Sequence, residues 1–339
     1  MRPSLRKRLF CLAVSAACAL AATACGSSTS PRDEATGGPA PLPIKLNLIG
    51  GSLVTLPLFL AREMRYFEKA GLDVQPLTTN NGNSATQLLS SGQLDIAIST
   101  IPVTIAANSS GGDLVIASGG ETREPLALQC RKGVGAVPGY PAGISSLAGK
   151  SIGTTAPGGA PDIYTRALLV SAGVDPARVS WVTVGSVPAE IAAIKAKRID
   201  CVTSVQPVQQ QLAGDVDTIV DVQNGQGPEF LLNANAWVYL ASKQFANANP
   251  EVINRFRSAI TATNAFLSDP ANAPAIAKAV APDYPGVGEP DLTGLIRGLA
   301  PSFAGAENIT ASQFDDAVKA YNLAYGKNVT AHQSELVLK

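Results

Sequence analysis

The sequence predicts an α/β fold of two lobes, each a mainly parallel sheet flanked by helices, with a helical C-terminal section. Short apolar segments typical of strands alternate with helical segments over residues 44–222, the order that βαβ units require. Residues 94–102 align without a gap on residues 199–207, with three identities, at equivalent places in two such runs. Beyond about residue 230 the apolar residues mostly follow a helical period.

The first run begins with a strand at 44–49, where apolar and polar side chains alternate until Gly50. Pro57 is well placed near a helix start, and Gly71 is suited to a helix C-terminus. Between them, apolar residues spaced by four, four and three positions predict one face of a helix: Leu56, Leu60, Met64 and Phe67. Further strands are predicted at 72–77, 94–99 and 114–118, with helices between them.

The same strand and helix periodicities of apolar residues predict the elements of the second run and of the C-terminal section. Strands are expected at 126–130, 151–155, 179–184, 199–204 and 218–222, and helices at 161–172 and 188–197. A last strand is expected at 236–241, followed by helices at 251–267, 274–280, 291–299 and 312–325.

Composition excludes several classes of function. The 339 residues suffice for about two domains, and their formal net charge of zero argues against a nucleic-acid-binding protein, which carries a basic face. The one histidine, His332, lies in a polar C-terminal stretch. We therefore expect no histidine-based triad, no metal site and no cofactor, and a binding protein rather than an enzyme.

The first 24 residues have a composition of their own. A basic start precedes the apolar run 9–20, which is too short for a typical membrane span, and the small residues 22–24 then lead to Cys25. This segment resembles a bacterial lipoprotein signal, although Ala22 stands where Leu is usual. The alternative is an ordinary secretory signal cut after Ala24. Removing its four basic residues leaves 22 Lys+Arg against 26 Asp+Glu, a net charge of −4.

A signal at 1–24 implies an extracytoplasmic protein, anchored to the cell membrane through a palmitate-type lipid on Cys25. Residues 25–43 are rich in Ser, Gly, Pro and Ala and predict a flexible tether. Of the five cysteines, Cys130 and Cys201 then remain in the folded part. They either pair in a disulfide or stay as separate buried thiols.

Four blocks carry a resemblance to a family. Their order and spacing, over about residues 44–267, are the specific part: Pro57-x-x-x-Ala61 with Tyr66-Phe67-x-x-x-Gly71-Leu72-x-Val74, then Gly82-Asn83-Ser84 with Gly92-x-Leu94-Asp95, then Leu147-x-Gly149-Lys150-x-Ile152-Gly153, then Gly173-Val174-Asp175-Pro176. The chain resembles the solute-binding proteins of ABC importers, in the branch that binds sulfonates, nitrate, taurine and thiamine-type pyrimidines.

The resemblance implies a type II periplasmic-binding-protein fold that closes on its ligand by hinge motion. The first lobe is expected at 44–123 plus 231–339 and the second at 124–230. We expect a monomer that captures a small organic solute between the lobes and delivers it to the permease. Two alternatives stay open: a lipoprotein ligand sensor, and an enzyme related to thiamine-pyrimidine synthase on the same fold.

Ligands of open α/β sheets bind beyond the carboxyl ends of the strands. The loops at these ends carry glycines and small polar residues, and the predicted ligand-binding residues are Gly51, Ser52, Gly82, Asn83, Ser84, Ser99, Thr100, Gly158, Gly159, Ser204 and Gln206. Trp237 is added as a residue that could stack on a ligand ring or belong to the core. Each loop residue could instead simply cap a helix or end a strand.

The charge of the ligand is left open by the sequence. The helix starts at Ser84 and Gly159 favour an anion, because free backbone N–H groups and the helix dipole point there. Against this, Asp162 lies in the first turn of the second helix, and the strand-end loops contain no Arg or Lys. A neutral or zwitterionic ligand is therefore the alternative to a sulfonate or nitrate.

Overall fold

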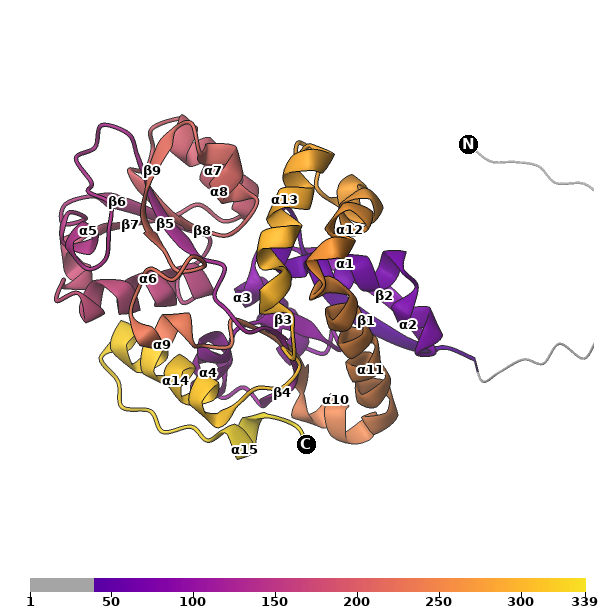
Figure 1. Ribbon diagram of the computed structural model, residues 1–339. Helices are drawn as coiled ribbons and strands as arrows, with labels where there is room; N and C mark the ends of the chain where they lie inside the picture. Colours follow the sequence, from indigo (N-terminus) through magenta and orange to yellow (C-terminus); the bar gives the residue numbers. More distant parts are fainter. Residues whose placement is uncertain (1–39) are drawn as a thin grey trace, which may run out of the picture. The chain divides into compact units, whose positions relative to one another are not determined.

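The computed structural model describes residues 40–339, which form one compact unit (Figure 1). The predicted signal, Cys25 and most of the predicted tether lie outside the described residues. None of the helices within 40–339 is long and apolar enough to cross a membrane. The predicted alternation of strands and helices is confirmed, with most element ends within a few residues of the predicted ones. The one helix predicted through Leu56 and Phe67 is instead two, Leu56–Glu63 and Tyr66–Lys69, because Arg65 between them has a left-handed backbone with a φ of +57°.

The first lobe is built on two groups of strands. Strand β1 (Leu42–Ile49) runs parallel to β2 (Leu72–Thr79). In the second group, β10 (Trp237–Ser242) lies between β3 (Ala97–Ser99) and β4 (Leu114–Glu121) and is antiparallel to both. A parallel bridge between Leu46 and Ile96 connects the two groups. The chain thus returns from the second lobe to place one reversed strand in the first.

The second lobe contains a five-stranded sheet in the order β7-β6-β8-β5-β9. Its strands are β5 (Ala127–Arg131), β6 (Ser151–Thr154), β7 (Ser180–Thr183), β8 (Cys201–Ser204) and β9 (Val216–Asp221). Strand β6 is parallel to β7 and β8, whereas β5 is antiparallel to β8 and β9. In both lobes, the strand that runs in the opposite direction to the others is the first strand in the sequence after the chain crosses from the other lobe. The boundaries predicted for the lobes stay a prediction.

The helices cover these sheets, and side chains cap two of the first nine. In the first lobe they are α1 (Leu56–Glu63), α2 (Tyr66–Lys69), α3 (Gly82–Ser90) and α4 (Ile101–Ser109). The next are α5 (Ala142–Ser145), α6 (Ala160–Ser171), α7 (Val187–Lys195), α8 (Val208–Leu212) and α9 (Glu229–Leu232). Side-chain oxygens of Asn81 and Thr100 accept backbone N–H groups and cap α3 and α4.

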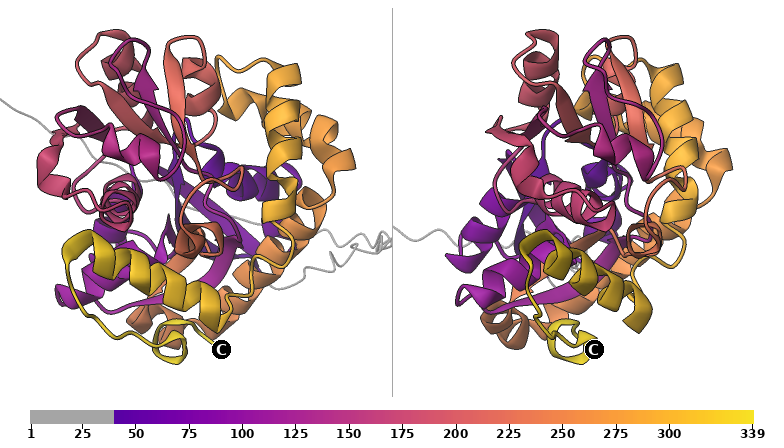
Figure 2. Two further views of the ribbon diagram at one scale, coloured as in Figure 1. Left: turned by 60° about the vertical axis from the view of Figure 1, so that its left-hand side comes forward. Right: turned by 90° about the vertical axis from the view of Figure 1, so that its left-hand side faces the viewer.

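The C-terminal section is helical, as predicted. It comprises α10 (Lys243–Ala248), α11 (Pro250–Leu267), α12 (Ala273–Val280), α13 (Glu289–Leu299), α14 (Ala311–Tyr325) and α15 (Gln333–Leu336). Helix α11 packs on α1 and α2, where Phe256 stacks on Phe67 with ring centroids 6.1 Å apart. Helix α14, yellow in Figure 2, packs on α6 as well as on α4 and α9, so it contacts elements of both lobes.

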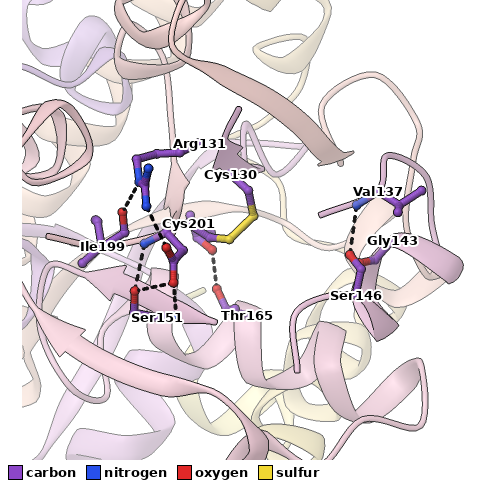
Figure 3. The surroundings of a disulfide bond; sticks show 11 residues. Cys130, Arg131, Val137, Gly143, Ser146, Ser151, Thr165, Ile199 and Cys201 are labelled. Carbon is purple, nitrogen blue, oxygen red and sulfur yellow. Dashed lines mark hydrogen bonds and ion pairs between the residues drawn. A yellow bond between two sulfur atoms is a disulfide. The ribbon is translucent and has the colours of Figure 1, made fainter. Parts of the chain in front are cut away.

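A disulfide links two neighbouring strands of the second sheet (Figure 3). Cys130 on β5 and Cys201 on β8 are direct partners in the antiparallel register, and both are fully buried. Beside them, Arg131 Nη2 lies 2.9 Å from Asp200 Oδ1. Burial works to raise the pKa of Asp200, but hydrogen bonds from Ser151 and Arg131 outweigh it and hold that pKa below its ordinary value.

Candidate functional site

A cavity lies between the strand ends of the two lobes. Its volume is about 40 Å³, enough for roughly three water molecules. Its wall is mainly apolar. Six of the residues predicted from the sequence line it: Ser52, Gly82, Ser99, Gly159, Ser204 and Trp237. These residues come from six different strand ends and helix starts, which the fold brings together.

The other predicted residues do not line this cavity. Gly51 lines a wider recess that adjoins it through Asn80 and Val187. The remaining five residues make local contacts or contacts between loops and are Asn83, Ser84, Thr100, Gly158 and Gln206. Thr100 Oγ1, for example, caps α4 by accepting the N–H of Val103.

Three buried polar atoms on cavity-lining residues lack a hydrogen-bond partner among the described residues. They are the Ser99 hydroxyl, the Trp237 indole N–H and one carboxyl oxygen of Glu190. Buried polar groups are normally paired, because an unpaired one costs about 1–3 kcal/mol. The three atoms offer an acceptor, a donor and a hydroxyl that serves as either. They are therefore available to a ligand that presents complementary groups.

Glu190 is the strongest electrostatic feature of the cavity. Its side chain belongs to the first turn of α7, is 2% exposed, and makes no ion pair within residues 40–339. Burial raises the pKa of Glu190 well above its ordinary value. An acid in such a site either keeps its proton or takes up a ligand that brings positive charge or N–H donors. The ionised carboxylate repels an anion, whereas the protonated carboxyl group offers an O–H donor.

The helix start at Gly159 is already occupied by a side chain of the protein. Asp162 Oδ2 accepts the N–H of Gly158 at 2.8 Å, and its other oxygen pairs with Arg166 at 2.8 Å. The carboxylate thus takes the position at the N-terminus of α6 where an external anion would bind. No Lys or Arg side chain lines the cavity.

Sequence reasoning missed Glu190, although a signal for it exists. It is the one acid in the apolar helix Val187–Lys195, and that helix follows the carboxyl end of β7. For Trp237 the sequence allows both a ligand role and a core role. It is 7% exposed, lies at the start of β10 and lines the cavity with its indole N–H unpaired.

Comparisons with known proteins identify relatives and the fold. The curated relatives include the 4-amino-5-hydroxymethyl-2-methylpyrimidine phosphate synthases THI13 and THI5 of Saccharomyces cerevisiae, each 26% identical over 236 residues. That match covers 64% of this chain, and the chain spans 65% of these relatives' length.

Solved structures of low sequence identity share the periplasmic-binding-protein fold. A protein of Bordetella bronchiseptica RB50 matches with a TM-score of 0.76 and 22% identity, over 87% of this chain and 94% of that one. The alkanesulfonate-binding protein SsuA of Xanthomonas axonopodis pv. citri, bound to MOPS, matches with a TM-score of 0.70 and 16% identity, over 89% and 99%. The two-lobe fold expected from the sequence is thereby confirmed.

The family model described as "NMT1/THI5 like" matches residues 53–273, well over half of the chain and most of both lobes. The matched range includes the strand-end loops and all three residues with unpaired atoms in the cavity. The chain therefore belongs to the NMT1/THI5-like family.

Proposed function

We propose that the protein is the solute-binding component of an ABC importer and captures a small nitrogen heterocycle of the aminopyrimidine type. The observation that carries this proposal is the unpaired carboxyl of Glu190 in a cavity that no cationic side chain lines. An aminopyrimidine offers a ring nitrogen and an exocyclic amine side by side. A carboxyl group pairs with such an edge through two hydrogen bonds, by giving its proton or accepting one.

The remaining walls of the cavity suit a flat ring. Val54, Val103 and Val187 supply apolar surface, and the Trp237 indole supplies both a ring face and an N–H donor. The cavity volume of about 40 Å³ is smaller than a substituted ring, so capture of such a solute requires the lobes to move apart. The curated relatives are named for a 4-amino-5-hydroxymethyl-2-methylpyrimidine phosphate, and a solute of this class without the phosphate matches a cavity without cationic side chains.

Transport is supported by the fold and by the N-terminal segment. Similar folds belong to an alkanesulfonate-binding protein and to the ligand-binding component of an ABC-type import system from Staphylococcus aureus. The segment ending at Cys25 supports export and lipid anchoring at the outer face of the membrane. Replacing Cys25 by Ala is expected to move the protein from the detergent phase to the aqueous phase in a partitioning assay.

A second candidate is an enzyme, because the curated relatives are named synthases. The two candidates differ in what happens to the bound solute. A binding protein returns an added pyrimidine unchanged, whereas a synthase forms a pyrimidine from other compounds. Mass spectrometry of the solute recovered after incubation separates them.

Calorimetry tests the ligand class directly. We expect 4-amino-5-hydroxymethyl-2-methylpyrimidine to bind more tightly than taurine, MOPS or nitrate. Glu190→Gln removes the acidic proton and the charge while keeping the shape, and is expected to weaken binding at least tenfold, about 1.4 kcal/mol. The matched control is Glu335→Gln, an exposed acid on α15, with unchanged affinity expected. Tighter binding of a sulfonate, or full affinity in Glu190→Gln, would contradict the proposed class.

A further inference from the structure

The loops around the cavity are joined from lobe to lobe by hydrogen bonds in three places. The backbone N–H of Leu53 donates to the carbonyl oxygen of Gln206 at 2.8 Å. Asn81 Nδ2 donates to the carbonyl oxygen of Gly185 at 3.3 Å, and Asn83 Nδ2 donates to that of Pro157 at 2.9 Å. In each pair the donor belongs to a strand-end loop or helix start of the first lobe and the acceptor to a strand-end loop of the second.

The two ends of the Asn81 side-chain amide make hydrogen bonds to different lobes. Its Oδ1 accepts the backbone N–H of Ser84 at 3.0 Å and thereby caps α3. Because that contact fixes which end of the amide faces the helix, Nδ2 is left to point at Gly185 in the other lobe. Asn81 also lines the cavity, so its amide closes part of the wall.

The Asn83 amide lies against the second-lobe loop that contains Gly158 and Gly159. A Cβ atom on Gly159 would lie 3.6 Å from Asn83 Oδ1, and one on Gly158 would lie 3.4 Å from the Tyr325 hydroxyl of α14. Gly158 also has a φ of +70°, which other residues rarely adopt. The first lobe, the second lobe and the C-terminal helix therefore meet at this loop.

We propose that Asn81 and Asn83 are closure residues, whose amides hold the lobes together over the cavity and set how long a bound solute stays. They act on the solute through the position of the second lobe, so they are positioning residues. The proposal concerns the closure of the same site as the proposed function and does not depend on the solute being a pyrimidine. Each donor adds a net stabilisation that corresponds to about a three- to tenfold change in the ratio of closed to open protein.

Aspartate substitutions isolate these donors. Asn81→Asp keeps an oxygen that caps α3 equally well, but it donates nothing to Gly185. Asn83→Asp likewise keeps its shape and loses the donor to Pro157. Asn254→Asp is the control, since it adds the same charge at an exposed position of α11.

Two measurements decide the proposal. Pulsed dipolar spectroscopy between labels at Gln93 and Lys132, both exposed and on different lobes, reports the distance between the lobes with no solute added. Stopped-flow fluorescence then gives association and dissociation rates for 4-amino-5-hydroxymethyl-2-methylpyrimidine. We expect a larger share of long distances and a three- to tenfold faster dissociation in each variant, with little change in the association rate or in the thermal midpoint.

Unchanged distances in both variants would overturn the proposal, as would a lowered thermal midpoint with the lobe distance unchanged, since that shows a structural role alone. If the wild-type protein binds no pyrimidine, the proposed ligand class fails. The distance measurement still decides the closure proposal, because it needs no solute.

Discussion

Segments 94–102 and 199–207 lie at equivalent places in the two lobes. The aspartate in each segment accepts the same kind of hydrogen bond from a neighbouring strand. Asp95 Oδ2 accepts the backbone N–H of Lys45 on β1 at 2.7 Å. Asp200 Oδ2 accepts the backbone N–H of Ser151 on β6 at 2.9 Å. Each carboxylate ties the start of one strand to the neighbouring parallel strand. The shared aspartate is therefore explained by the construction of the sheets and not by the ligand.

The shared serines differ. Both serines line the cavity, but Ser204 Oγ donates to Gln129 Oε1 at 3.1 Å, whereas Ser99 Oγ has no partner among the described residues. The neighbouring strands cause the difference, because β8 lies beside β5, which carries Gln129, and β3 lies beside β10. One motif thus gives a structural serine in one lobe and a serine available to a ligand in the other.

The largest expected difference between the lobes comes from the disulfide. Replacing Cys130 and Cys201 by Ser frees a loop of 71 residues and is expected to lower the free energy of unfolding by about 4 kcal/mol. Hydrogen exchange should accelerate first at β5 and β8. The control is Ile96→Val, at the place in the first lobe equivalent to Cys201, with an expected loss of about 1 kcal/mol. Equal acceleration in both lobes of the double variant would contradict this.

The second difference lies in the two segments that connect the lobes. The segment after β4 carries Glu124, which is buried without an ion-pair partner in the described structure, whereas the segment after β9 carries the exposed Glu229. Burial raises the pKa of Glu124 to about 8, although the Tyr164 hydroxyl works in the other direction.

Stability should therefore fall as the pH rises. The folded-state pKa lies above the unfolded one, so the contribution of Glu124 is complete below pH 4.5 and is lost as the pH passes through about 8. Between pH 5.5 and 7.5 we expect the free energy of unfolding to drop by about 3 kcal/mol on this account. Glu124→Gln should make the fall less steep by one titrating group, because burial also raises the pKa values of Glu121 and Glu190, and Glu229→Gln should leave the profile unchanged. A wild-type profile that is already flat would show that Glu124 is ionised in the fold.

The sequence predicted the fold well because periodicity reports which faces of strands and helices are buried. It placed the strand ends, and six of its site residues reach the cavity. It could not separate Ser99 from Ser204, because their partners come from strands that pair only in the folded chain. It missed Glu190 for a similar reason. An acid in the first turn of a helix ordinarily faces water and favours the dipole, and the packing of the two lobes buries this one.

Replacing Asp95 and Asp200 is expected to give a smaller difference in the free energy of unfolding between the two lobes. Asp200 accepts hydrogen bonds from Ser151 and Arg131, whereas Asp95 holds one backbone N–H. Asp200→Asn is expected to lower the free energy of unfolding by about 2 kcal/mol and Asp95→Asn by about 1 kcal/mol. The pKa of Asp200 is lowered, so its contribution is present above the unfolded pKa and fades as the pH falls through the folded one. The deficit of Asp200→Asn should thus shrink in acid, and a deficit independent of pH would argue against the ionic contribution.

Replacing Ser99 or Ser204 is expected to change stability least, and it separates a structural role from a ligand-binding role. Ser204→Ala leaves Gln129 Oε1 without its donor and should cost about 1 kcal/mol, with little effect on solute affinity. Ser99→Ala removes a hydroxyl that is unpaired in the fold, so it should leave stability unchanged or slightly higher, and weaken solute binding about fivefold. Urea unfolding and calorimetry on both variants measure the two quantities. We expect Ser204→Ala to lose stability and keep affinity, and Ser99→Ala to keep stability and lose affinity. If both variants lost stability and affinity together, the two serines would have the same role in both lobes.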